Sequence, residues 1–468
     1  MGRGWRESDI DVAWPAAGRE PYPPLNHWWW RARLCNVGFR DPDSPSANTA
    51  DSLPALLDAA RSDYEALRAK ELSLDLTRGK PSARQLDLSA ELLSLPGVRH
   101  TSADGTDCRN YGAADGLLEL REIFSGFLQV PAGQLLAVGN SSLELMHDSL
   151  VHALLGTVPG AARRWADEER IAFLCPVPGY DRHFALCERF GIEMIPVPMT
   201  AEGPDMDAVE RLVAEDPAVK GIWCVPKYSN PDGTCYSDET VRRLAAMPTA
   251  APDFRIFWDN AYAVHHLTDE EVEIEDVLAA CAASGHPDRV LVFGSTSKIT
   301  LAGAGVAFFG SSPANVAWLR GNSAKRSIGP DKINQLRHVM FLRDPDGVRD
   351  HMRKHRELLR PKFDTVLRVL EERLGGTGLA TWSTPRGGYF ITLDVPDGCA
   401  REVVRRAADA GLALTPAGAT HPYGDDPRDR TIRIAPSFPD SSEIAEIIDG
   451  VATCVRLVGY EKLVSGVS

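Results

Sequence analysis

Short apolar runs alternate with amphipathic segments between about residue 135 and residue 310. Six of these runs are rich in Ile, Val and Phe: RIAFLCPV, IEMIPVPM, GIWCVP, FRIFWDN, RVLVFGS and AGVAFFG. Strands that are apolar on both faces are typical of a mostly parallel sheet covered by helices. The pattern therefore predicts a large, doubly wound α/β domain.

The segments on either side of this region show a helical period. Apolar positions recur at three- and four-residue spacing in residues 52–70 and in residues 348–374, which predicts a helix in each. Three further segments follow the second helix: GGYFITLDV, AREVVRRAADAG and RTIRIAPSF. Their patterns predict a strand, a helix and a strand. This mixture predicts a smaller α+β domain. We expect residues 51–100 to join this small domain, residues 101–345 to form the large one, and residues 346–468 to complete the small one.

The first fifty residues have neither period. Residues 1–50 are rich in Pro and Gly and contain a Trp triplet, without the apolar core and small-residue cleavage site of a secretory signal. We expect a disordered N-terminal extension outside the fold.

Charge and cysteine usage narrow the class of protein. The formal net charge is −14, which disfavours nucleic-acid binding because phosphate backbones require clustered Lys and Arg. No apolar run approaches the length of a membrane span. The nine cysteines are scattered without a C-x-x-C pair, which favours reduced thiols in a cytoplasmic protein over disulfides or a metal site. A site for small molecules is the remaining expectation.

Polar residues follow four of the predicted strands directly. Asp259 and Tyr262 come from FWDNAY, Asn230 from SNPDGT, Lys298 from GSTSKIT, and residues 140–142 from VGNSSLEL. Singly, each has an ordinary interpretation as a helix cap, a turn or a solvated lysine. Together they indicate a ligand site, because the carboxyl ends of parallel strands meet at one crevice, where ligands bind in such sheets.

The order of these residues resembles that of the class I aminotransferases, which are fold-type I pyridoxal-phosphate enzymes. The resemblance covers residues 51–468 and implies a large domain with a mostly parallel seven-stranded sheet between helices, plus a smaller α+β domain. It implies pyridoxal 5′-phosphate as the cofactor and amino and keto acids as substrates.

The resemblance also gives each strand-end residue a role. Lys298 would form the Schiff base with the cofactor aldehyde and then act as general base and acid. Asp259 would pair with the pyridinium nitrogen. Asn230 and Tyr262 would hydrogen-bond the phenolic oxygen of the cofactor, and Tyr180 of PVPGYDRH would stack on its ring.

The cofactor phosphate would be held by hydroxyls and by the start of a helix. The residues implied are Asn140, Ser141, Ser142, Ser295 and Ser297. In the family a tyrosine of the partner subunit joins them, and Tyr111 of RNYGAADG stands in the matching motif. This role implies a homodimer with shared sites.

One position departs from the family pattern. Many members carry a phosphate-binding arginine eight residues after the lysine, where this chain has Val306. Another cation would take its place, with Lys325, Arg326 and Lys332 as candidates. With this valine, the chain resembles the bacterial type Ic aspartate aminotransferases in four further motifs: TRGKPS, GTDCRNYG, IGPDKINQLRH and PRGGYFI. By sequence, that subgroup is grouped with the aminotransferase-like domain of MocR regulators.

Substrate recognition would use a bidentate arginine. Arg433 of RTIRIAPSF matches the residue that binds the substrate α-carboxylate in the family. Gly79 and Lys80 of TRGKPS and Asn230 would also contact substrate, and the distal carboxylate of aspartate would need a further cation. The candidates for that cation are Arg78, Lys80, Arg326 and Arg386.

Three functions are compatible with these residues. The first is transfer of the amino group from L-aspartate to 2-oxoglutarate, which gives oxaloacetate and L-glutamate by a ping-pong mechanism. The second keeps the cofactor but changes the substrate or bond, as in a kynurenine or aromatic aminotransferase or a carbon–sulfur lyase. The third, a MocR-type regulator, is disfavoured because residues 1–50 are too short for a winged-helix domain of about 60 residues.

Overall fold

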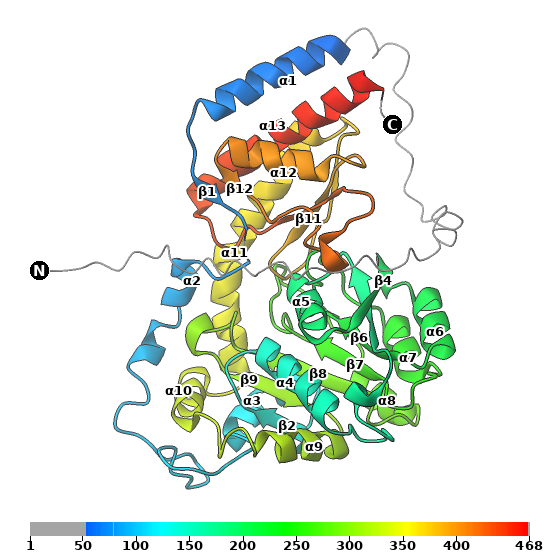
Figure 1. Cartoon of the computed structure of the whole chain (residues 1–468). Helices are drawn as coiled ribbons and strands as arrows, with labels where there is room; N and C mark the ends of the chain where they lie inside the picture. Colours follow the sequence, from blue (N-terminus) through cyan, green and yellow to red (C-terminus); the bar gives the residue numbers. More distant parts are fainter. Residues whose placement is uncertain (1–52, 78, 467–468) are drawn as a thin grey trace, which may run out of the picture. The chain divides into compact units, whose positions relative to one another are not determined.

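A mixed sheet of eight strands organises the centre of the chain. In the computed structural model, which describes residues 53–77 and 79–466, the strand order is β2-β9-β8-β7-β6-β3-β4-β5 (Figure 1). The bounds are β2 Leu135–Ala137, β3 Ala172–Val177, β4 Glu193–Thr200, β5 Gly203–Pro204, β6 Val219–Cys224, β7 Arg255–Asp259, β8 Val290–Ser295 and β9 Ala307–Gly310. Strands β8, β7, β6, β3 and β4 run parallel, whereas β9 is antiparallel to both of its neighbours.

The predicted architecture is confirmed, with one strand more than the seven expected. The six apolar runs form β3, β4, β6, β7, β8 and β9. The additional edge strand, β5, has only two residues and pairs antiparallel with the end of β4. So short a strand leaves no period in the sequence from which it can be predicted.

The central strands are buried on both faces. All five residues of β7, RIFWD, are buried. Ile256 and Trp258 point into the hydrophobic cluster on one face of the sheet and Phe257 into the cluster on the other. This division explains why the strands read as continuous apolar runs rather than as an alternation.

Helices cover both faces of the sheet. The first face packs against helices α3 Leu118–Leu128, α6 Met206–Glu215, α7 Asp238–Ala246, α8 Val277–Ala283 and α10 Lys332–Leu342. The opposite face packs against α4 Ser142–Leu155, α5 Asp181–Phe190 and α9 Pro313–Ser323. A sheet covered in this way directs the carboxyl ends of its parallel strands to one common edge.

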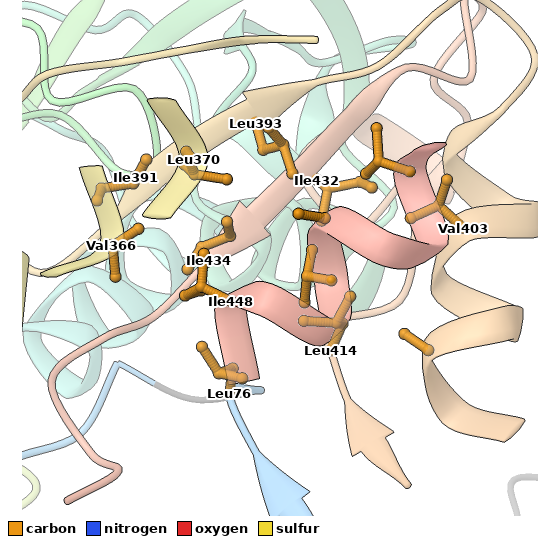
Figure 2. Close-up of a cluster of buried hydrophobic side chains, with 14 of the residues drawn as sticks. Leu76, Val366, Leu370, Ile391, Leu393, Val403, Leu414, Ile432, Ile434 and Ile448 are labelled. Carbon is orange, nitrogen blue, oxygen red and sulfur yellow. The ribbon is translucent and has the colours of Figure 1, made fainter. Parts of the chain in front are cut away.

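A second core lies among the C-terminal elements. Strands β10 Thr381–Trp382, β11 Ile391–Asp394 and β13 Thr431–Ile434 form an antiparallel sheet that packs with α12 Ala400–Asp409 and α13 Ser441–Ser465. Figure 2 shows this cluster, in which Val366, Ile391, Ile432 and Ile448 converge from separate elements.

The N-terminal segment completes this second core. Helix α1 Leu53–Arg68 contributes Leu57 and Tyr64, and Leu76 follows strand β1 Leu74–Asp75, which pairs in parallel with β12 Leu412–Ala413. The boundaries expected at residues 100 and 345 stay a prediction, and the expected disorder of residues 1–50 lies outside the described residues.

A thirty-residue helix connects the two cores. In α11 Pro345–Leu374, Val348 and Met352 pack in the core of the large sheet, whereas Leu359 and Phe363 pack in the C-terminal core. Any shift of this helix is therefore felt in both cores, because side chains in packed interiors transmit displacements. Over residues 53–77 and 79–466, no helix combines the length and apolar character that a membrane crossing requires.

Candidate active site

Lys298 lies in the turn that follows β8, on the side where the parallel strands end. Its Nζ is 5.1 Å from the centre of the Tyr262 ring. Burial disfavours the ammonium form and lowers the pKa of Lys298, although the negative charge of Asp259 opposes this effect. A lysine amine with a lowered pKa spends more time as the neutral nucleophile.

Asp259 ends β7 and is only 2 % exposed. Its Oδ2 accepts a hydrogen bond from His183 Nε2 at 3.1 Å, while its Oδ1 is buried and has no hydrogen-bond partner among the described residues. Buried carboxylate oxygens are almost always hydrogen-bonded. The free Oδ1 therefore suits an N–H donor such as a protonated pyridine nitrogen.

His183 was missed by the sequence interpretation, although it stands in the quoted motif PVPGYDRH. His183 lies in the first turn of α5, and Tyr180, three residues earlier, is the N-cap residue of that helix. At this spacing the two side chains lie on the same side of the helix start. The His183 ring stacks on Trp223 at 4.4 Å and 10°, and Tyr180 contacts it edge-on at 4.9 Å. The sequence feature that could have predicted this role of His183 is a strand end followed by a tyrosine and, three residues later, a histidine.

Two tyrosines lie beside the lysine and the aspartate: Tyr262 is buried and Tyr180 is partly exposed. Burial and the charge of Asp259 raise the pKa of both Tyr180 and Tyr262. Their phenols therefore stay protonated and can donate hydrogen bonds at neutral pH. The structure thus brings Lys298, Asp259, Tyr180 and Tyr262 together as the sequence predicted.

Arg433 lies on β13 with only 7 % of its surface exposed. Its Nη1 donates to Asp181 Oδ1 at 2.8 Å and to Asn230 Oδ1 at 3.4 Å, and its guanidinium lies 5.0 Å from the centre of the Phe390 ring. Its Nε is buried without a partner among the described residues. With Nη1 engaged by Asp181 and Asn230, Nε is available to a carboxylate. Asp181 was not predicted.

Gly79 allows the N-terminal segment to lie beside this arginine. A Cβ at position 79 would meet the Phe390 ring at 2.2 Å, well inside van der Waals contact. Lys80 follows it, exposed, with Nζ 4.0 Å from the centre of the Phe438 ring, and its carbonyl accepts a bond from Ser437 Oγ at 3.0 Å. The segment therefore contacts the loop that leaves β13.

The other predicted substrate cations are placed differently. Arg386 is exposed and pairs with Glu270 at 2.7 Å, and Arg326 pairs with Glu144 at 3.1 Å and Asp148 at 3.0 Å. Both guanidinium groups are thus engaged by carboxylates of the large domain's segments. Arg78 lies outside the described residues.

The predicted phosphate residues gather at the start of α4 and after β8. Ser141 caps α4, with its Oγ accepting from Glu144 N, and Ser142 is the first helical residue. Ser295 Oγ donates to Ser297 Oγ at 3.1 Å. The amide group of Asn140 donates to Gly303 O at 3.4 Å, which links the two segments. Backbone N–H groups at a helix start and these hydroxyls can bind a phosphate.

A pocket of about 370 Å³ opens beside this helix start. It is lined by Asn140, residues 303–306, Asn334 and Arg337. Val306 itself is buried in the core, and Lys332, one of the expected cations, instead donates to Gly112 O at 2.9 Å. Arg337 on α10, whose Nε has no partner among the described residues, is a cation that the sequence interpretation did not consider.

His338 supports the lysine turn from α10 and makes stability depend on pH. Its Nδ1 donates to Asn334 O at 2.7 Å, its Nε2 accepts from Thr300 Oγ1 at 2.9 Å, and burial lowers its pKa to about 4. As pH falls below the unfolded value of about 6.5, the unfolded chain binds a proton that the folded chain does not. This histidine's contribution is therefore complete above about pH 6.5 and is lost on acidification toward about pH 4.

We expect the wild type to lose about 2 kcal/mol more unfolding free energy than His338→Gln between about pH 7 and about pH 5. Denaturant titrations of both proteins at the two pH values measure this difference, and other titrating groups cancel in the comparison. An equal loss in the two proteins would show that His338 does not titrate with a lowered pKa.

Comparisons with known proteins agree with this geometry. Residues 48–466 match the family model described as aspartate amino-transferase. The chain is 56% identical to an aminotransferase-like protein of Mycolicibacterium smegmatis, over 88% of this chain and 97% of that one. It is 51% identical to the aspartate aminotransferase of Corynebacterium glutamicum, over 85% of this chain and 92% of that one. A crystal structure of an aspartate transaminase from Corynebacterium glutamicum superposes with a TM-score of 0.86 at 49% identity, covering 88% of this chain and 97% of that one. The protein with Lys298 and Asp259 at adjacent strand ends thus belongs to the aspartate amino-transferase family.

Proposed function

We propose that the protein is an aspartate aminotransferase that uses pyridoxal 5′-phosphate to transfer the amino group of L-aspartate to 2-oxoglutarate. The observation that carries this proposal is the pairing of Lys298, an amine of lowered pKa, with the buried and unpartnered Oδ1 of Asp259. The 51% identity to a protein named as an aspartate aminotransferase supports the choice of substrate.

The residues at the strand ends suit this cofactor. When bound, it supplies an electron-withdrawing ring that stabilises negative charge on the substrate α-carbon. Asp259 Oδ1 would accept a hydrogen bond from the ring N–H, and its charge would keep that proton in place. Asn230 and Tyr262 would hydrogen-bond the phenolic oxygen, and Tyr180 would pack on the ring face.

Lys298 is the proton carrier in this proposal. Its Nζ would anchor the cofactor at rest and, once free, would take the proton from the α-carbon of aspartate and deliver it to the cofactor within the same half-reaction; the second half-reaction would run these transfers in reverse. A lowered pKa favours this role, because the neutral amine accepts a proton readily near neutral pH.

The phosphate is proposed to lie at the start of α4. Asn140, Ser141 and Ser142 would meet it there, with Ser295 and Ser297 across from them. Arg337 is our candidate for the cation that replaces the missing arginine at Val306, because it lines the adjacent pocket. We also propose a homodimer, in which Tyr111 of the partner subunit reaches this phosphate; Tyr111 is 77 % exposed in the chain as described.

The substrate is proposed to bind between Arg433 and the segment that contains Gly79. Arg433 would bind the α-carboxylate, with Asn230 beside it. Lys80 and Arg386 stay our predictions for the distal carboxylate. Lys80 is favoured, because its backbone is bonded to Ser437, which lies in the loop leaving the strand of Arg433.

Replacing Arg433 with lysine is expected to raise the KM for aspartate by about 10- to 100-fold, with a smaller change in kcat. A bidentate charge-assisted pair is worth roughly 1.5–3 kcal/mol, and a lysine ammonium cannot present two parallel donors. Steady-state kinetics with aspartate varied at saturating 2-oxoglutarate measure the effect. An unchanged KM would remove Arg433 from the carboxylate site.

The choice of substrate is tested by oxaloacetate formation. We expect aspartate with 2-oxoglutarate to give the highest kcat/KM, with parallel double-reciprocal lines as a ping-pong mechanism requires. A higher kcat/KM with kynurenine or phenylalanine as the amino donor would move the protein to an aromatic or kynurenine aminotransferase. Release of pyruvate and ammonia from a cysteine conjugate in place of transamination would identify a carbon–sulfur lyase.

A further inference from the structure

Three buried histidines hold the turn that carries Lys298, residues 296–300. They come from the loop after β7, from α10 and from α11. The contacts join His265 Nε2 to Lys298 O at 3.2 Å, His351 Nε2 to Ile299 O at 2.7 Å, and His338 Nε2 to Thr300 Oγ1 at 2.9 Å. Three successive residues of one turn are thus each bound by a different element.

The protons on these rings follow from their partners. A carbonyl oxygen only accepts, so His265 and His351 donate from Nε2. His338 donates from Nδ1 to Asn334 O and therefore accepts at Nε2 when it is neutral. One proton on each ring satisfies these contacts, and burial lowers the pKa of all three rings, which favours that neutral state.

Two of the bonds fix the backbone around the lysine. A hydrogen bond to Lys298 O sets the peptide plane between residues 298 and 299, and one to Ile299 O sets the next plane. Two adjacent fixed planes leave little freedom in the dihedral angles between them. These angles belong to Ile299, and the Cα of Lys298 is one end of the first plane, so the position from which the Lys298 side chain starts depends on these donors.

Of the two donors, His351 makes the shorter hydrogen bond, and it also contacts other segments of the chain. It lies on α11 between Val348 and Met352, which pack in the large-sheet core, and about two turns before Leu359, where the same helix enters the C-terminal core. Its Nε2 is also 3.2 Å from Ser89 Oγ, in the segment after α2 Ala83–Asp87, and 3.2 Å from Nε2 of His355, one turn further along α11. The ring is only 5 % exposed. The lysine turn is therefore bonded directly to the helix that connects the two cores.

We propose that His351 is a positioning residue for the reaction, because it holds the Lys298 turn against α11 so that Nζ stays beside Asp259 and Tyr262. This inference rests on the proposed role of Lys298. His351 does not touch the reacting atoms; it acts through Ile299 O, and α11 carries the alignment from the C-terminal core to the lysine.

The test compares three variants of the full-length protein loaded with pyridoxal phosphate. His351→Leu removes the donor to Ile299 O and is expected to lower kcat for aspartate by about 10- to 100-fold, since misplacement of a catalytic group by about 1 Å has effects of this size. The KM is expected to change by less than about threefold, because the carboxylate site at Arg433 is untouched. The pH midpoint of the cofactor's visible absorbance is expected to shift, because the lysine environment changes.

His351→Gln is the conservative variant, because its amide nitrogen can replace Nε2, and it is expected to recover kcat to within about threefold of the wild type. His152→Leu on α4 is the control, since the His152 ring packs edge-on at 6.1 Å from Trp318 and its Nε2 has no partner among the described residues. We expect it to keep the wild-type kcat per folded protein.

Three results would overturn the positioning role: a wild-type kcat in His351→Leu, an effect on KM alone, or a His351→Gln variant no better than the leucine variant. If His351→Leu does not fold, His351→Asn takes its place, because its amide is one bond too short to reach Ile299 O. These outcomes are distinct from failure of the proposed function, which would appear as a wild-type protein unable to transaminate aspartate.

Discussion

Replacing Lys298 with alanine is expected to lower kcat for transamination by about 10⁴-fold or more, because the change removes the proposed covalent anchor and proton carrier. Wild-type protein that is reduced with borohydride and then denatured should retain the cofactor on the peptide containing Lys298. The alanine variant treated in the same way should release it. Mass spectrometry of the digested proteins measures both results.

Lys220→Met is the matched control for this prediction. Lys220 is also a buried lysine, but it lies in β6 near the start of that strand, where its Nζ pairs with Asp253 at 2.9 Å and Glu168 at 3.1 Å. We expect lower stability and an unchanged kcat per folded protein. Significant turnover by Lys298→Ala, or cofactor attached to another lysine, would contradict the assignment.

Replacing Asp259 with asparagine is expected to lower kcat by about 10²- to 10³-fold, an effect typical of losing one preorganised electrostatic contact. Asparagine keeps the size of the side chain but removes the negative charge that would hold a proton on the cofactor ring. We expect the KM for aspartate to change less than kcat, because in the proposed site the substrate carboxylate binds separately, at Arg433. Steady-state kinetics and cofactor occupancy from absorbance separate the two effects.

Asp253→Asn tests whether the effect depends on the end of the strand. Asp253 precedes β7 and is as deeply buried as Asp259, which ends the same strand. Loss of its charge leaves buried Lys220 with Glu168 as its remaining carboxylate partner and should lower stability by up to about 3–5 kcal/mol. Activity per folded protein should stay at the wild-type value. Equal losses of kcat in both variants would show that the Asp259 effect is one of stability.

Much of the fold could be predicted because the central strands are buried on both faces. A run such as FRIFWDN is apolar throughout only when helices cover both sides of its sheet, so the pattern led directly to the α/β architecture. The same reasoning placed Asp259 and Lys298 at neighbouring strand ends, where the structure has them. Strand β5 escaped prediction because its pairing depends on β4 rather than on its own two residues.

The parts of the site that escaped prediction depend on contacts between distant segments. His183 is recognisable only once α5 places it beside Asp259, 76 residues later in the chain. Asp181 belongs to the site because it forms an ion pair with Arg433, which lies on a strand of the C-terminal core. Arg386 stays a prediction for the substrate site, although in the structure its exposed guanidinium pairs with Glu270. The order of the motifs along the chain predicts which residues lie at the same edge of the sheet. It does not predict which partners the long side chains of arginine and lysine contact.

The central claim is that Lys298 and Asp259 serve a pyridoxal phosphate that accepts the amino group of aspartate. The most direct test is the visible spectrum of the purified protein loaded with this cofactor. We predict that L-aspartate removes the absorbance of the lysine-bound cofactor and produces that of the pyridoxamine form, and that 2-oxoglutarate then restores the original spectrum. A spectrum that aspartate leaves unchanged would contradict the account.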